Sequence, residues 1–163
     1  MSASLAYAEA LRAAVRVEEN GAAFYKAAAA ASPDPEAALV FARLAEMEEE
    51  HRGYFSALSL ALEQREGLFV TDPKGEFAAS VRELADTGVF ALTRSPEEAP
   101  GAAKSAREAV KFAIGMEKDS VVFYLGLQEA MVDREESDKL GGIIKEEMRH
   151  LTILSGLLKK VRD

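Results

Sequence analysis

The chain has 163 residues, with 20 Lys and Arg against 28 Asp and Glu, and a formal net charge of −8. This length suits one domain with a sizeable core, and we expect residues 1–163 to form a single domain. The acidic balance argues against a nucleic-acid partner, because the sequence offers no basic stripe to meet phosphates. Since the chain has no cysteine, disulfides, thiolate metal centres and cysteine nucleophiles are excluded.

The sequence predicts neither a signal peptide nor a membrane span. The N-terminal segment lacks a basic stretch followed by an apolar block. Charged residues interrupt each apolar stretch well before it reaches membrane-spanning length. We therefore expect a cytoplasmic protein without a membrane partner.

Two long helices are predicted in the first part of the chain. Apolar residues recur at helical spacing from about residue 4 to residue 31, and the sequence Ser-Pro-Asp-Pro that follows ends this helix. Asp34 fits the N-cap of the next helix, with Pro35 as its first helical residue. We expect this second helix to continue to about Gln64.

Two further helices are predicted in the last part of the chain. Ser105 and Glu108 have the spacing of a capping box, which predicts a helix from there to about Met131. Asp133 is followed by a glutamate at the same spacing, and the last helix is expected to reach about Val161.

A long connection, at about residues 67–104, separates the two helix pairs. Its ends are rich in turn residues, whereas residues 76–88 read as a short helix that ends at Gly88. A connection of this length needs a structural reason, and a crossover along a helix bundle supplies one. The sequence therefore predicts an all-α four-helix bundle, in which two helix hairpins are joined by a long crossover with a short helix.

The second half of the chain repeats the first at a distance of 99 residues. This distance separates the two histidines, His51 and His150, and each follows a glutamate by three positions. The same shift aligns further pairs: Glu18 with Glu117, Phe24 with Phe123, Tyr25 with Tyr124, Asp34 with Asp133, and Leu58 with Leu157. An internal duplication of a helix hairpin accounts for these matches.

The spacing predicts that six side chains meet at one level of the bundle. In each half, the glutamate of the Glu-x-x-His pair has another glutamate 30 residues before it, and the midpoint falls in the hairpin turn. Residues equidistant from the turn of an antiparallel hairpin lie at the same height, and the i, i+3 pair shares one helix face. The predicted cluster consists of Glu18, Glu48, His51, Glu117, Glu147 and His150.

Four buried carboxylates require compensating cations, which two divalent metal ions would supply. Carboxylate and imidazole ligands without thiolates suit iron or manganese, with zinc as a further option. One Glu from each of two helices, with Glu-x-x-His from each of the other two, is the arrangement of di-iron carboxylate bundles. A solvated acidic helix face is the simpler reading of the segment EEEH alone, but its repetition favours a metal centre.

Two tyrosines are expected close to this level. Tyr25 and Tyr124 follow the first glutamate of each half by seven residues, so they lie on nearly the same helix face. They could donate hydrogen bonds that orient the ligating carboxylates, or they could be core aromatic residues with satisfied hydroxyls. The glutamates without such a double match are expected to face solvent or to contact the ligands: Glu19, Glu46, Glu49, Glu50 and Glu146.

At EENGAAFY and EEEH, and at their counterparts EKDSVVFY and EEMRH, the sequence resembles the rubrerythrin branch of the ferritin-like superfamily. The resemblance covers about residues 5–64 and 105–161. It implies a ferritin-like fold, two iron ions held by the six clustered residues, Glu48 and Glu147 as bridges between the ions, and a homodimer.

The resemblance also implies a non-haem di-iron oxidoreductase that reacts with hydrogen peroxide or dioxygen. Two features depart from rubrerythrins: Ser120 stands where they have an additional glutamate, and these 163 residues contain no rubredoxin domain for electron entry. We therefore expect an external electron donor. The alternatives are a ferroxidase or iron-handling protein, and a binding module that metal ions stabilise.

Overall fold

The computed structural model describes residues 3–64, 76, 79–80 and 105–161. Within these ranges the chain forms four long helices: α1 (Ala3–Ala31), α2 (Pro35–Gln64), α4 (Ala106–Glu129) and α5 (Arg134–Leu158). Residues 76, 79 and 80 are helical, and the rest of the predicted short helix and crossover lies outside the described residues. The prediction of an all-α bundle is confirmed.

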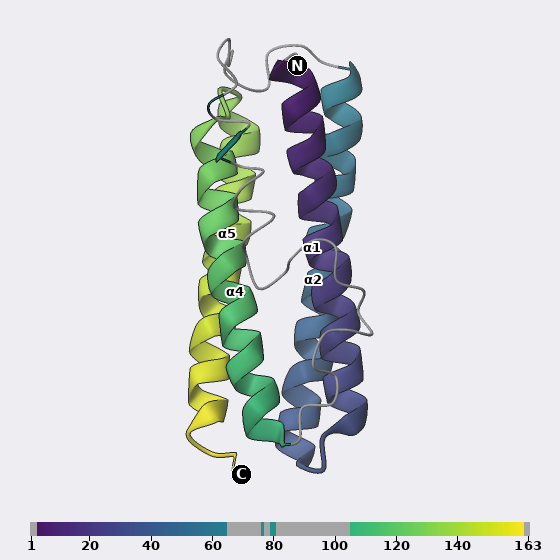
Figure 1. Ribbon diagram of the computed structural model, residues 1–163, viewed down its shortest axis with the longest axis vertical. Coiled ribbons are helices and arrows are strands. Elements are labelled where there is room, and N and C mark those ends of the chain that lie inside the picture. Colours follow the sequence, from purple (N-terminus) through teal and green to yellow (C-terminus); the bar gives the residue numbers. More distant parts are fainter. Residues whose placement is uncertain (1–2, 65–75, 77–78, 81–104, 162–163) are drawn as a thin grey trace.

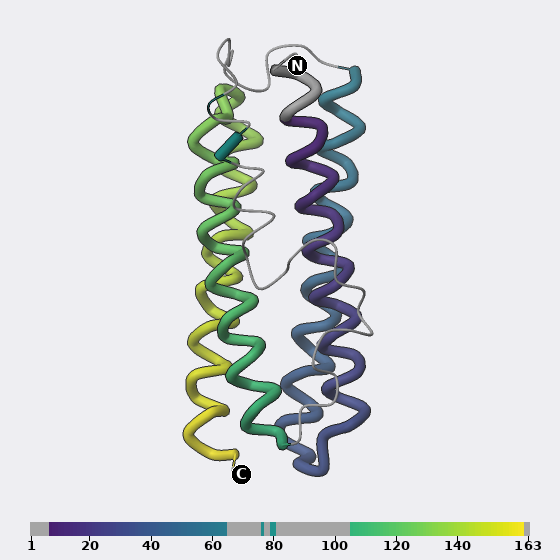
Figure 2. Tube along the Cα trace, viewed as in Figure 1, coloured from purple at the N-terminus to yellow at the C-terminus, as the bar shows by residue number. Residues whose placement is uncertain are grey.

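The four helices form two hairpins that lie side by side (Figure 1). α1 packs mainly against α2, and α4 packs mainly against α5. The coloured trace in Figure 2 shows α1 and α5 running down the page and α2 and α4 running up. The end of α2 and the start of α4 therefore lie at opposite ends of the bundle, as the predicted crossover requires.

Side-chain caps fix the starts of three helices at the predicted residues. Asp34 Oδ1 accepts hydrogen bonds from two backbone N–H groups in the first turn of α2, at 2.8 and 3.0 Å. Ser105 and Asp133 each accept one from the backbone N–H three residues later, at 3.3 and 3.1 Å. These bonds satisfy donors that a helix start leaves without an intrahelical partner.

The last two helices end slightly earlier than the sequence suggested, because tighter turns close them. α4 ends at Glu129 and α5 at Leu158. Arg107 Nη1, on α4, donates to the carbonyl oxygens of Leu158 and Val161, at 3.1 and 3.3 Å. The Arg107 side chain thus gives a hydrogen-bond donor to carbonyl groups at the end of α5 that have no intrahelical partner.

Two apolar clusters fill the bundle, one on each side of a polar layer. The first includes Leu11, Phe55, Tyr124, Leu127 and Leu140. The second includes Tyr25, Phe41, Leu44, Val110 and Leu154. On α1, Val17 belongs to the first cluster and Phe24 to the second, and buried Glu18 lies between them. The polar layer is thus enclosed by apolar side chains from both directions along the bundle axis.

None of the four described helices combines the length and the apolarity that crossing a bilayer requires.

Candidate metal centre

The polar layer contains six buried ionisable side chains. Each is at most 5% exposed, and together they are the buried Asp, Glu, Lys, Arg and His residues of the described part of the chain: Glu18, Glu48, His51, Glu117, Glu147 and His150. They are the six residues predicted to cluster. α1 and α4 contribute one glutamate each, and α2 and α5 contribute a glutamate and a histidine each.

The six side chains form two overlapping groups that could each hold a metal ion. One group is Glu18, Glu48, His51 and Glu147, and the other is Glu48, Glu117, Glu147 and His150. Within each group the candidate ligand atoms all lie within 4.8 Å of one another. Glu48 and Glu147 belong to both groups, so the two groups share these two carboxylates.

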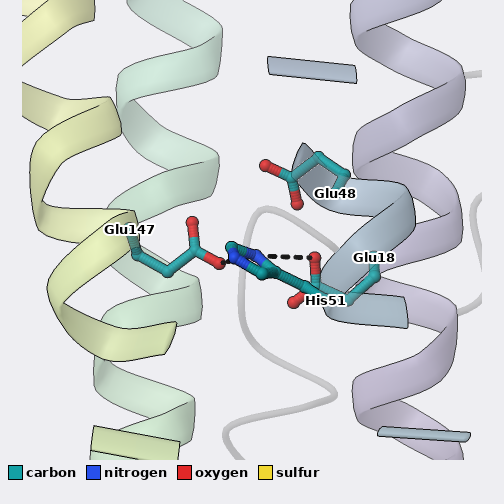
Figure 3. Close-up of side chains that lie close together, drawn as sticks. All are labelled: Glu18, Glu48, His51 and Glu147. Carbon is teal, nitrogen blue, oxygen red and sulfur yellow. Dashed lines mark ion pairs between the residues drawn. The ribbon is translucent and has the colours of Figure 1, made fainter. Parts of the chain in front are cut away.

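The carboxylate of Glu147 lies between the two histidine rings. Its Oε1 is 2.9 Å from Nδ1 of His51, and its Oε2 is 3.0 Å from Nδ1 of His150. Figure 3 shows Glu147 reaching from α5 toward His51, with Glu18 on the far side of the ring at 3.7 Å from Nδ1. His150 Nδ1 also lies 3.4 Å from Glu48 Oε1. Both histidines therefore direct Nδ1 at the carboxylates.

Burial and neighbouring charges strongly shift the pKa values of three of the carboxyl groups, those of Glu18, Glu117 and Glu147. Burial, with the neighbouring carboxylate of Glu48 adding to it, raises the pKa of Glu18 well above its usual value. Burial also raises the pKa of Glu117, against the opposing effect of His150. For Glu147, burial acts in the same direction, but the imidazoles of His150 and His51 outweigh it and lower the pKa below its usual range.

The two imidazoles show the complementary effect. Burial by itself lowers the pKa of His51, but the carboxylates of Glu147 and Glu18 outweigh it and raise the pKa to about 11. In the same way, Glu117 and Glu147 overcome burial and raise the pKa of His150 to about 12. Without metal, the layer therefore favours protonated imidazoles beside an ionised Glu147.

Each of the two predicted tyrosines donates a hydrogen bond across the bundle. The Tyr25 hydroxyl, on α1, donates to Glu117 on α4, and the Tyr124 hydroxyl, on α4, donates to Glu18 on α1. Both tyrosines are fully buried, one in each apolar cluster. Each hairpin thus positions a carboxylate of the other hairpin.

The unpaired atoms of the layer fit divalent cations. Seven of its buried polar atoms lack a hydrogen-bond partner: Glu18 Oε2, Glu48 Oε1, His51 Nδ1, both oxygens of Glu147, and both ring nitrogens of His150. Buried polar atoms normally have partners, so such a concentration of unpaired donors and acceptors needs an explanation. Oxygen and imidazole nitrogen atoms that converge from four helices match the ligands of iron, manganese or zinc.

Glu146 and Gly21 lie close to the ligands but did not stand out in the sequence as parts of the site, and Ser120 stands where the resemblance predicts a glutamate. Glu146 Oε2 lies 2.9 Å from His51 Nε2, although nothing in its spacing distinguished it from other glutamates. Gly21 lies so close to Glu48 that a Cβ atom there would be 3.1 Å from Glu48 Oε2. Ser120, the repeat counterpart of Gly21, is buried with the site residues.

Comparisons with known proteins identify the family and the fold. The sequence model of the rubrerythrin family matches residues 9–158. Among solved structures, a Thermotoga maritima protein assigned to the ferritin-like diiron-carboxylate proteins is similar, with a TM-score of 0.63 and 22% sequence identity. The similarity covers 98% of this chain and 95% of that one, and at this identity it establishes the shared fold. No curated protein gives a significant match.

Proposed function

The chain belongs to the rubrerythrin family, and from this membership we propose that it is a non-haem di-iron protein that carries out redox chemistry with hydrogen peroxide or dioxygen. The observation that supports the proposal best is the buried layer of six ionisable side chains, whose unpaired atoms converge in two overlapping groups. Such a layer is costly to bury unless cations compensate its carboxylates.

The proposed ligands divide between two metal positions. Glu18 and His51 would hold one ion, Glu117 and His150 would hold the other, and Glu48 and Glu147 would contact both. Two ferrous ions bound there would supply the two electrons that convert one hydrogen peroxide and two protons into two water molecules. An external electron donor would then restore the reduced state.

The surrounding side chains have definable tasks in this proposal. The hydroxyls of Tyr25 and Tyr124 hold Glu117 and Glu18 in place, so these carboxylates do not reorganise freely when the charge of the site changes. The apolar clusters above and below the layer limit access of water along the bundle axis, which strengthens the electrostatic interactions inside. We also propose a cytoplasmic homodimer, by analogy with the family.

Ser120 supports a second candidate, a ferroxidase or iron-handling protein. The side chain is buried three residues after Glu117 on α4, where the sequence resemblance implies a further glutamate in rubrerythrins. A serine hydroxyl at that position supplies no carboxylate, so oxidation of ferrous ions by dioxygen, with release of the product, would be the main reaction.

Anaerobic iron loading followed by mixing with oxidant tests the proposal. We expect about two ferrous ions per chain, and oxidation that is faster with hydrogen peroxide than with dioxygen; the reverse order would favour the ferroxidase candidate.

Glu48→Ala and Glu147→Ala should abolish stoichiometric binding and rapid oxidation, because each removes a ligand of both ions. Glu49→Ala is the matched control, since its side chain is partly exposed and pairs with Lys26 and Arg52. Binding of no more than trace iron or manganese by the wild-type chain would refute the proposal.

A further inference from the structure

The two halves of the centre differ at the outer nitrogen of their histidines. His51 Nε2 lies 2.9 Å from Glu146 Oε2, a carboxylate of the opposite hairpin whose side chain is 41% exposed. His150 is the repeat counterpart of His51, but it is fully buried, and its Nε2 has no hydrogen-bond partner among the described residues. One imidazole is therefore anchored on its outer side and the other is not.

This difference corresponds to a single position of the repeat. Glu146 directly precedes Glu147 on α5, whereas the residue that precedes Glu48 on α2 is Met47. A thioether is only a weak acceptor, so methionine cannot replace the carboxylate as a partner for an imidazole N–H. The repeat thus has its candidate ligands in both halves but the outer carboxylate in one half alone.

The outer nitrogen determines how well each histidine can act as a ligand. Because Nδ1 of both rings faces the carboxylates, a neutral ring that binds a metal ion through Nδ1 must carry its proton on Nε2. For His51 this N–H meets Glu146, which fixes the tautomer, orients the ring and increases its basicity. For His150 the same tautomer leaves a buried N–H without a partner, which has a free-energy cost.

From this asymmetry we infer that the two metal positions are unequal, and that the position built by Glu18 and His51 binds a divalent cation more tightly and fills first. The inference rests on the proposed di-iron function. Outer partners of ligating histidines typically change metal affinity by about 10-fold to 100-fold, which sets the expected difference between the positions.

Stepwise titration of the metal-free protein with Co²⁺ under anaerobic conditions tests the inference, because the visible spectrum of Co²⁺ reports each ligand set as it fills. The wild-type chain should bind two ions in two steps, whose dissociation constants differ by about 10-fold or more. Glu146→Gln and Glu146→Met should weaken the first step, the methionine variant by more, and leave the second step nearly unchanged. The retained second step shows that the variant is folded.

A charge-matched control separates the hydrogen bond from general electrostatics. Glu50 is exposed and directly precedes His51, so Glu50→Gln removes one negative charge beside the same histidine. Glu50→Gln should change the dissociation constants of both Co²⁺-binding steps slightly and to a similar extent. The inference is overturned if the wild-type chain binds both ions with equal affinity, if Glu146→Gln weakens only the second step, or if Glu50→Gln reproduces its effect. Failure to bind Co²⁺ at all would instead refute the proposed di-iron function.

Discussion

Opposite charges lie next to each other in the polar layer even without metal. Protonated His51 and His150 flank the ionised carboxylate of Glu147, at 2.9 and 3.0 Å. The raised pKa values of Glu18 and Glu117 favour their neutral forms. A layer of four carboxylates can therefore remain buried in the metal-free protein, with protons in the place that divalent cations would take.

Gly21 offers a test of how closely the layer is packed around one shared carboxylate. A Cβ atom at this position would lie 3.1 Å from Glu48 Oε2 and 3.4 Å from its Cδ, so Gly21→Ala forces that carboxylate to shift by a few tenths of an ångström. We expect Co²⁺ or Fe²⁺ to bind about 10-fold more weakly, because both positions use Glu48. The metal-free protein should become no less stable, since alanine favours the helix over glycine by about 1 kcal/mol.

Gly53→Ala is the control for this variant, because a Cβ atom there would have no neighbour within 4 Å. It should show the same gain in helix stability without any loss of metal affinity. Equal metal affinities of the two variants would show that the space beside Gly21 does not matter for Glu48.

At the scale of elements, three of the four described helices, α2, α4 and α5, have side-chain caps that do not involve the metal centre. Asp133 caps the start of α5, and this helix carries Glu147 and His150. Asp133→Ala should lower the free energy of unfolding by about 1 kcal/mol, because the first turn loses an acceptor for its N–H groups. For a chain of this size the midpoint of thermal unfolding should fall by about 2–4 °C.

Asp133→Asn provides the comparison, because an asparagine side chain caps a helix about as well as aspartate does. It should melt close to the wild-type temperature, and both variants should keep the metal stoichiometry. Thermal unfolding followed by circular dichroism measures the effect. An unchanged midpoint for Asp133→Ala would mean that the cap contributes nothing to the stability of α5.

The heights of the site residues along the helices could be predicted from the sequence, but their contacts across the bundle could not. Equal spacing from a hairpin turn determines that Glu18 lies level with Glu48, whatever the hairpin packs against. The hydrogen bonds that Tyr25 donates to Glu117 and His51 donates to Glu146 depend on how the two hairpins dock and rotate against each other. No periodicity within one helix carries that information, which is why the sequence left open whether Glu146 faces solvent or contacts the ligands.

For the molecule as a whole, the polar layer couples folding to protonation. The pKa values of His51 and His150 rise from 6.5 to about 11 and about 12, so their contribution to stability is complete below pH 6.5 and is lost as the pH rises. Glu18 and Glu117 keep protons that the unfolded chain releases above pH 4.5, so they act in the same direction. Glu147, with its lowered pKa, stabilises the fold above pH 4.5 and loses this effect as the pH falls.

The metal-free protein should therefore become less stable as the pH rises from about 5 to about 9. The loss should be steepest above pH 6.5, because the histidines of the unfolded chain lose their protons there. Bound metal ions should remove this trend, because the ligands have then already released their protons, and the stabilisation by metal should increase with pH. Thermal unfolding of chelator-treated and Mn²⁺-loaded protein, compared across this pH range, measures both effects. A melting temperature of the metal-free protein that stays constant or rises above pH 6.5 would contradict the protonated state of the layer, even if metal binding itself were intact.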